Sequence, residues 1–245
     1  MKNSIAEMRM KNTNSLEKPL LNDWFIATEI ILYELHKSIF HYTISIGKDA
    51  LYLLDPSYPT NLNCITFNFI KYELNSASIE ELIKSFNKRD SLFLYRLHGD
   101  VVDKGECLEA FVTISDKFSN VISDYRMRFS SASFNKRNFR QKWIKLPSLD
   151  EKVFLFIEEK EKVLADELEF LINSLRISEM DTLRIVYLLS CELRKNDARF
   201  YLDKLADKLK FSDRFSLIRD IEGVFLKCHN NRNLKLVMKQ IDELL

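Results

Sequence analysis

Glycine and proline are scarce in this chain, with four of each in 245 residues. Glycine-rich loops that cradle phosphate groups and turn-dense β-sandwiches both need more of these two residues, so the composition disfavours both. Because 46% of the residues are hydrophobic and 30% are charged, we expect an ordinary globular chain. Helices should dominate it, and its length suffices for two domains.

Signals for export, membrane insertion and a disulfide framework are also missing. The N-terminal segment is polar and lacks the apolar stretch of a signal peptide, and no run of about 18 apolar residues follows it. The four cysteines have no C-x-x-C spacing. We therefore expect a cytoplasmic protein with reduced thiols and no membrane contact.

Catalytic motifs are absent as well, since the chain contains no G-x-S-x-G, H-E-x-x-H or phosphate-loop sequence. The most plausible site histidine is His98 beside Asp100, but a lone histidine before a turn is more typical of a solvated loop. The sequence therefore predicts a binding protein rather than an enzyme, with no metal and no cofactor. The formal net charge is only +1, so any attraction to nucleic acid must come from a local surface.

Hydrophobic periodicity predicts a flexible tail over residues 1–21 and a mixed α/β domain over 22–130. In chain order, we expect a helix over 22–38, strands over 40–46, 49–55 and 63–74, a helix over 78–89, strands over 91–97 and 107–114, and a helix from about 116 to 129. Gly47 and Lys48 would turn the first hairpin.

Residues 131–176 are expected to form a basic linker followed by a long connecting helix. The linker interleaves basic and aromatic side chains, a pattern that can follow a phosphate backbone while stacking on bases, and that is also typical of a solvated linker. The candidate phosphate contacts are Lys136, Arg137, Arg140 and Lys142. Further on, Leu164, Leu168, Leu171 and Leu175 recur with coiled-coil spacing, which fits either a dimer helix or a helix packed inside the protein.

Residues 177–245 are expected to form an all-helical domain. After a core helix over 178–196 and an extended segment over 198–202, a short helix begins at Asp203 and a second helix is capped by Ser212. The apolar residues of that second helix share one broad face, and Ser212, Ser216 and Arg219 lie opposite. Outward positions of this kind enter the major groove when such a helix reads DNA.

The segment "LADKLKFSDRFSLIR" at 205–219 is similar to the L-A-x-x-L-x-x-S stretch of bacterial helix-turn-helix regulators, and the resemblance covers residues 177–245. Ser212 followed by an aromatic residue and an arginine resembles the AraC type, "RISEMDTLRIVYLL" resembles the opening helix of the LuxR type, and "VFLKC" with "LKLVMK" resembles the strands of a winged type. The subtype stays open. The resemblance implies phosphate contacts by Lys208, Lys210 and Arg214, with Ser216 and Arg219 facing bases.

The element order expected over 22–130 resembles that of the small chaperones of type III secretion systems. Those chaperones hold segments of secreted proteins against an exposed apolar face and are commonly dimers. This second resemblance implies a protein partner for the N-terminal domain.

The sequence thus predicts an α+β chain: a mixed α/β sensor or dimerisation domain followed by an all-helical helix-turn-helix domain. We expect it to act as a homodimer on double-stranded DNA to regulate transcription. A secretion-associated chaperone or scaffold is the alternative. A plain helical hairpin is also open, because Asp207, Asp213, Asp220 and Glu222 lie among the basic residues and would weaken attraction to phosphate.

Overall fold

The computed structural model describes residues 19–48, 50–55, 57–59, 64–88, 91–105, 107–132, 137–174, 178–227, 239 and 241. The chain divides into two compact units. Unit 1 comprises Met1–Leu54 and Asn61–Ile157, and unit 2 comprises Asp55–Thr60 and Glu158–Leu245. The main division therefore follows Ile157, whereas the sequence predicted that the first domain ends near residue 130.

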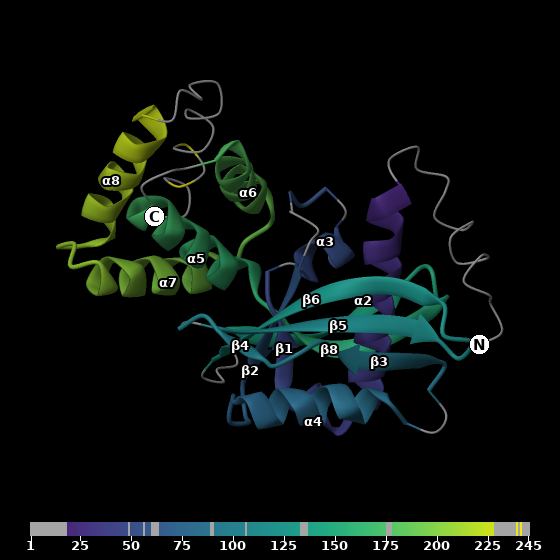
Figure 1. Cartoon of the computed structure of the whole chain (residues 1–245). Helices are drawn as coiled ribbons and strands as arrows, with labels where there is room; N and C mark the ends of the chain where they lie inside the picture. Colours follow the sequence, from purple (N-terminus) through teal and green to yellow (C-terminus); the bar gives the residue numbers. More distant parts are fainter. Residues whose placement is uncertain are drawn as a thin grey trace. The chain divides into compact units, whose positions relative to one another are not determined.

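Unit 1 is built on a mixed β-sheet with helices packed against it (Figure 1). Its helices are α2 (Pro19–Lys37), η1 (Ile39–Tyr42), α3 (Ala50–Leu54) and α4 (Ser76–Phe86). Its strands are β1 (Ile44–Ile46), β2 (Cys64–Phe69), β3 (Phe93–Leu97), β4 (Val102–Asp103), β5 (Leu108–Asp116), β6 (Val121–Ser131), β7 (Phe139–Leu146) and β8 (Glu151–Glu158). The strand order is β3-β5-β6-β2-β1-β8-β7, with β4 paired to β5. Strands β2 and β6 run parallel, as do β1 and β8.

One face of this sheet forms the core of unit 1, because successive side chains of a strand point to opposite faces. On β6, for example, Tyr125, Met127 and Phe129 are buried, while Arg126 and Arg128 point to the other face. The buried residues of the strands join those of α2 and α4 in one apolar cluster. Helix α2 is surrounded by this core, which explains why its side chains are buried along most of its length.

Strand β3 forms one edge of the sheet, and side chains pair with its backbone where no further strand does. Asn87 donates to the carbonyl of Tyr95 (2.7 Å) and accepts from its amide (2.8 Å). Ser91 makes the corresponding contacts with the carbonyl and amide of Phe93. Because open strand edges recruit other strands, these side chains protect unit 1 from edge-to-edge association.

The predicted fold class is wrong. Instead of a domain of five strands ending near residue 130 and an all-helical helix-turn-helix domain after a linker, the chain has an eight-stranded sheet that continues to Glu158. The expected hairpin around Gly47 is absent, because β1 pairs with β2 and the Gly47 amide donates to the carbonyl of Thr66 (2.8 Å). Residues 50–54, expected as its second strand, form α3.

The helix expected from about 116 to 129 is strand β6. Its alternation of buried and polar residues from Asp124 onward has period two, and pairing with β5 and β2 on both sides stabilises it as a strand. Asp116, expected near the start of a helix, instead accepts from the amides of Phe118 and Asn120 (both 2.9 Å) and holds the turn between β5 and β6. Asx turns of this kind compete with helix caps for the same residue type.

The basic linker and the front half of the long connecting helix are strands β7 and β8. Val153, Leu155 and Ile157 are buried at alternate positions, which is the strand period. The four-residue turn between β7 and β8 includes Asp150 with a φ of 55°, a left-handed conformation that aspartate tolerates better than most residues. The helical part of the predicted connector is α5 alone.

Unit 2 contains four helices among its described residues: α5 (Lys160–Asn173), α6 (Glu179–Ser190), α7 (Lys195–Lys208) and α8 (Arg214–Lys227). Residues 198–202, expected to be extended, belong to α7, where Ala198, Leu202 and Leu205 are buried at helical spacing. The first strand expected for a winged domain lies largely in α8. The second falls outside the described residues except for its last residue, Lys239, which is helical.

Helix α5 lies at the centre of unit 2, since it contacts α6, α7 and α8. Leu164, Leu168 and Leu171 are buried in these contacts, and Leu175 lies outside the described residues. The leucine seam therefore packs inside unit 2, as the second of the two alternatives predicted. Within the part of the chain that the structure describes, no helix is both long and apolar enough to cross a bilayer.

Candidate nucleic-acid interface

The connection between α7 and α8 is a tight turn held by its own backbone. The Phe211 amide donates to the carbonyl of Ala206 (2.9 Å) and the Lys210 amide to that of Asp207 (3.2 Å), which closes the end of α7. Lys210 has a φ of 62°, the left-handed position that glycine usually occupies after a helix. The sequence signal for a turn here was therefore weak, although the turn forms where it was predicted.

Asp213 caps helix α8, and the prediction that Ser212 does so is wrong. The Ser216 amide donates to the Asp213 carboxylate at 2.7 Å. Hydrogen bonds from Ser216 lower the pKa of Asp213, because they stabilise its charged form. The Ser212 hydroxyl instead lies 2.7 Å from the Ser216 hydroxyl.

Helix α8 buries one side and exposes the other. Leu217, Ile218 and Ile221 are buried where α8 contacts α5 and α7. Ser216, Arg219 and Gly223 lie on the opposite side of the helix, and Ser212, which precedes the cap, lies beside Ser216. We call these four residues the α8 stripe. Ser212 and Arg219 are exposed, and Ser216 and Gly223 are half-buried.

Gly223 leaves open space on the α8 stripe. Among the described residues, a Cβ atom placed there would have no atom within 4 Å apart from its two chain neighbours and the nearby backbone of its own helix. A glycine inside a helix costs stability relative to alanine, and no contact among the described residues of unit 2 requires a glycine at this position. The half-buried Gly223 therefore leaves room on the α8 stripe that a side chain would otherwise fill.

The three residues predicted to anchor phosphate differ in their contacts. Lys208 forms an ion pair with Glu169 of α5 (2.5 Å), and Arg214 forms one with Asp203 of α7 (3.3 Å). Lys210 is exposed in the turn. Phosphate would therefore have to compete with carboxylates for two of the three cations, which weakens their contribution to binding.

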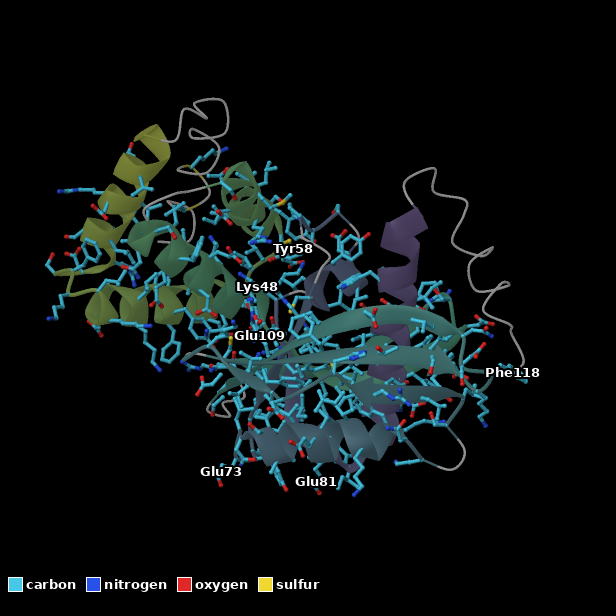
Figure 2. All side chains as sticks on the ribbon, viewed as in Figure 1. Lys48, Tyr58, Glu73, Glu81, Glu109 and Phe118 are labelled. Atoms are coloured by element: carbon cyan, nitrogen blue, oxygen red, sulfur yellow. The ribbon has the colours of Figure 1, made fainter. Side chains whose placement is uncertain are left out.

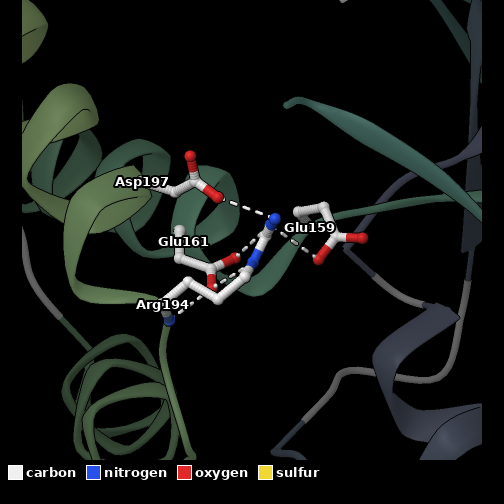
Figure 3. A network of polar contacts seen from close by, with 4 residues as sticks. All are labelled: Glu159, Glu161, Arg194 and Asp197. Atoms are coloured by element: carbon white, nitrogen blue, oxygen red, sulfur yellow. Dashed lines mark hydrogen bonds and ion pairs between the residues drawn. The ribbon is translucent and has the colours of Figure 1, made fainter. Parts of the chain in front are cut away.

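Arg194 holds the start of α7 against the start of α5 (Figure 3). Its guanidinium contacts Glu159 (3.1 Å), Glu161 (3.1 Å) and Asp197 (2.7 Å), and its backbone amide donates to Glu161 (2.7 Å). Glu159 and Glu161 are buried. Two buried carboxylates without a cation would be strongly unfavourable, so Arg194 fixes the position of α7 and, through it, of α8.

A short segment from the N-terminal half of the chain also belongs to unit 2. Tyr187 of α6 donates to Asp55 (2.5 Å), Tyr58 packs edge-on against the Tyr187 ring, and Arg184 donates to the carbonyl of Pro59 (3.1 Å). Hydrogen bonds from Ser57 and from Tyr187 lower the pKa of Asp55 to about 2. Sequence reasoning missed this arrangement, because the partners lie far apart in the chain.

The candidate phosphate contacts of the basic stretch belong to unit 1, whereas the α8 stripe belongs to unit 2. Arg137 precedes β7, Arg140 and Lys142 lie on β7, and Lys136 lies outside the described residues. The predicted contacts are therefore divided between the two units. Within unit 2, the predicted contacts around the α7–α8 turn and on α8 are Lys208, Lys210, Ser212, Arg214, Ser216 and Arg219.

A charged cluster on the polar face of the unit 1 sheet escaped the sequence analysis. Glu109 of β5 is buried and accepts from Arg128 of β6 (2.9 Å), and Arg126 lies 3.9 Å away; Figure 2 labels Glu109. Burial raises the pKa of Glu109, but the hydrogen bond from Arg128 and the two positive charges outweigh it and lower the pKa. The cluster was missed because both arginines were assigned to a helix. It is a cross-strand ion pair that stabilises the sheet.

Comparison with known proteins reveals a likeness in fold. No known protein family and no curated protein matches the chain. The structure of JHP933 from Helicobacter pylori is similar with a TM-score of 0.51, covering 94% of this chain and 96% of its own, at 14% identity. A second H. pylori structure, described as a candidate nucleotidyltransferase, reaches a TM-score of 0.49 over 94% of this chain and 99% of its own, at 13% identity, which is too weak to bear on function. The likeness to JHP933 concerns the fold alone.

Proposed function

We propose that the protein binds double-stranded DNA through the α8 stripe and regulates transcription without catalysis. The observation that carries the proposal is the exposure of Arg219 on a helix whose opposite side is buried. A guanidinium in the major groove can hold O6 and N7 of guanine, and hydroxyl groups such as that of Ser212 can contact phosphate or base edges. Gly223 would let the helix backbone come close to the duplex.

The remaining charges near the stripe make the binding specific rather than strong. Lys210 is the cation best placed to meet phosphate, while Asp220 beside Arg219 repels it. We therefore expect weak affinity for DNA of arbitrary sequence and a much higher affinity for a matching sequence. Lys208 and Arg214 would exchange their carboxylate partners for phosphate on binding.

The proposal includes a homodimer in the cytoplasm as the active form. Two copies would read two half-sites related by the symmetry of the dimer. The described cysteines Cys64, Cys107 and Cys191 are free thiols, which fits a reducing compartment. The leucine seam of α5 is occupied inside unit 2, so dimerisation would use another surface.

Selection from a random duplex pool tests the proposal with the full-length chain. We expect an enriched sequence whose affinity falls steeply with salt, and we expect Arg219→Ala to bind it about 5- to 150-fold more weakly with relaxed preference at one base pair. Arg96→Ala, an exposed arginine on β3 of unit 1, is the matched control and should leave binding unchanged. If no sequence is enriched and the chain instead purifies with a protein, the partner-binding alternative replaces this proposal.

A further inference from the structure

The hairpin of β7 and β8 presents aromatic and basic side chains on the face of the sheet that lies away from the core. Ile144 of β7 and Leu155 of β8 point inward and belong to the core cluster. Trp143 and Phe154 point the other way, with their ring centroids 5.0 Å apart, and the Trp143 side chain is 62% exposed. A large exposed indole is unusual on a soluble surface and is a common feature of binding sites.

Two lysines lie next to this aromatic pair. Lys145 follows Trp143 by two residues and Lys152 precedes Phe154 by two residues, so both share the face of the rings. Both lysines are exposed, and within the part of the chain that the structure describes neither forms an ion pair. A third lysine, Lys71, lies over the ring of Phe156, the next outward residue of β8.

The turn length places Lys145 and Lys152 directly across the hairpin from each other. The strands are joined by residues 147–150, so Leu146 faces Glu151 and, counting back, Trp143 faces Phe154. The contact between those two rings agrees with this register. Like charges directly opposite each other destabilise a strand pair, and such local conflicts are typical of functional positions. An anion bound between the lysines would relieve their repulsion.

We propose that this outer face of the β7–β8 hairpin binds single-stranded nucleic acid. In this proposal, one base stacks on the indole of Trp143, which Phe154 contacts across the hairpin. One phosphate lies between Lys145 and Lys152. The alternation of a flat apolar ring and a cationic pair matches the alternation of base and phosphate along a strand. The site differs in unit and in ligand from the proposed duplex contact of the α8 stripe.

Tryptophan fluorescence of the full-length chain reports on this site directly. The chain has two tryptophans, and Trp24 is stacked on Tyr125 with its indole nitrogen buried. Quenching by an oligo(dT) strand would therefore come from Trp143. We expect Trp143→Ala to weaken binding of labelled oligo(dT) about tenfold, measured by anisotropy, and Trp143→Phe to retain most of the affinity because a ring remains to stack on.

The lysines are tested by the salt dependence of the same binding. We expect the double variant K145Q/K152Q to lower the slope of log affinity against log salt by about 0.7, because the two lysines share one phosphate and each phosphate contact on a single strand contributes about 0.7. The matched control K84Q/K117Q removes two exposed lysines elsewhere on unit 1 and should keep the slope.

Two results overturn the proposal: wild-type affinity of Trp143→Ala for oligo(dT), or an equal loss of slope in the control. The duplex proposal fails separately, if Arg219→Ala leaves binding to the selected duplex unchanged.

Discussion

Glu29 offers a sharp test of the core of unit 1. This carboxyl group of α2 is fully buried, and one of its oxygens accepts from the Ser148 amide at 2.8 Å while the other has no hydrogen-bond partner. Burial raises the pKa of Glu29 from 4.5 to about 7 in the folded protein, because desolvation penalises the charged form more than the hydrogen bonds from Ser148 and Leu149 favour it. Replacement by glutamine keeps an acceptor for Ser148 and removes the charge.

The sign of the pH effect follows from which state holds the proton. Between pH 4.5 and about 7, the unfolded chain has lost the Glu29 proton and the folded chain retains it, so the free energy of unfolding falls as the pH rises through this window. Above about pH 7, both states have lost the proton, so the contribution of Glu29 to the free energy of unfolding no longer changes with pH. The difference between a pKa of 4.5 in the unfolded chain and about 7 in the folded protein corresponds to about 3 kcal/mol of unfolding free energy. We therefore expect Glu29→Gln to gain about 3 kcal/mol of stability relative to wild type between pH 4.5 and a pH above 7.

Urea denaturation of both proteins across this pH range measures the effect. Contributions of other titrating groups cancel in the difference between variant and wild type. Glu80→Gln, on the exposed side of α4, is the control and should show no such trend. The reasoning is refuted if Glu29→Gln and wild type keep a constant difference in unfolding free energy throughout.

Three further substitutions test unit 2, each measured by urea denaturation. Lys210→Gly should raise the free energy of unfolding by about 1 kcal/mol, because Lys210 is held at a φ of 62°; an unchanged stability would argue against this turn. Arg194→Ala should lower it by about 3 kcal/mol, because Glu159 and Glu161 would stay buried without their cation; a loss below about 1 kcal/mol would contradict the role of the network. Gly223→Ala should raise it by about 0.5 to 1 kcal/mol, since the added methyl meets open space; a loss would mean that the position is packed.

Elements with strong local periodicity could be predicted from the sequence. Helix α2, helix α4 and strands β3 and β5 form close to where the pattern placed them. The buried face of α8 was also predicted, since Leu217 and Ile221 recur at helical spacing. In each of these elements, the spacing of the apolar residues fits either the helical period or the strand period, but not both.

Elements decided by long-range pairing could not be predicted. Tyr125 and Phe129 are four residues apart, which fits a helix as well as a strand, and only the pairing of β6 with β2 and β5 decides between them. The same holds for β8, whose run of apolar residues has no glycine or proline to mark its boundary with α5. Because β6, β7 and β8 were misassigned, the eight-stranded sheet itself was missed.

At the candidate site, the sequence predicted which residues of α8 are exposed, but it did not predict which carboxylates pair with the basic residues. Arg219 lies on the exposed side of α8, as its place on the helical wheel predicted. The ion pairs of Lys208 with Glu169 and of Arg214 with Asp203 join different helices, and no local pattern encodes them. Predicting them requires the packing of α7 and α8 against α5.

The most direct test of the central claim is the affinity of wild type and Arg219→Ala for a duplex selected from a random pool, measured by anisotropy over a range of salt concentrations. If the α8 stripe contacts the duplex, wild-type binding weakens as salt rises, and Arg219→Ala binds about 5- to 150-fold more weakly with a relaxed sequence preference at one base pair. Equal affinity and equal preference of the two proteins would contradict it.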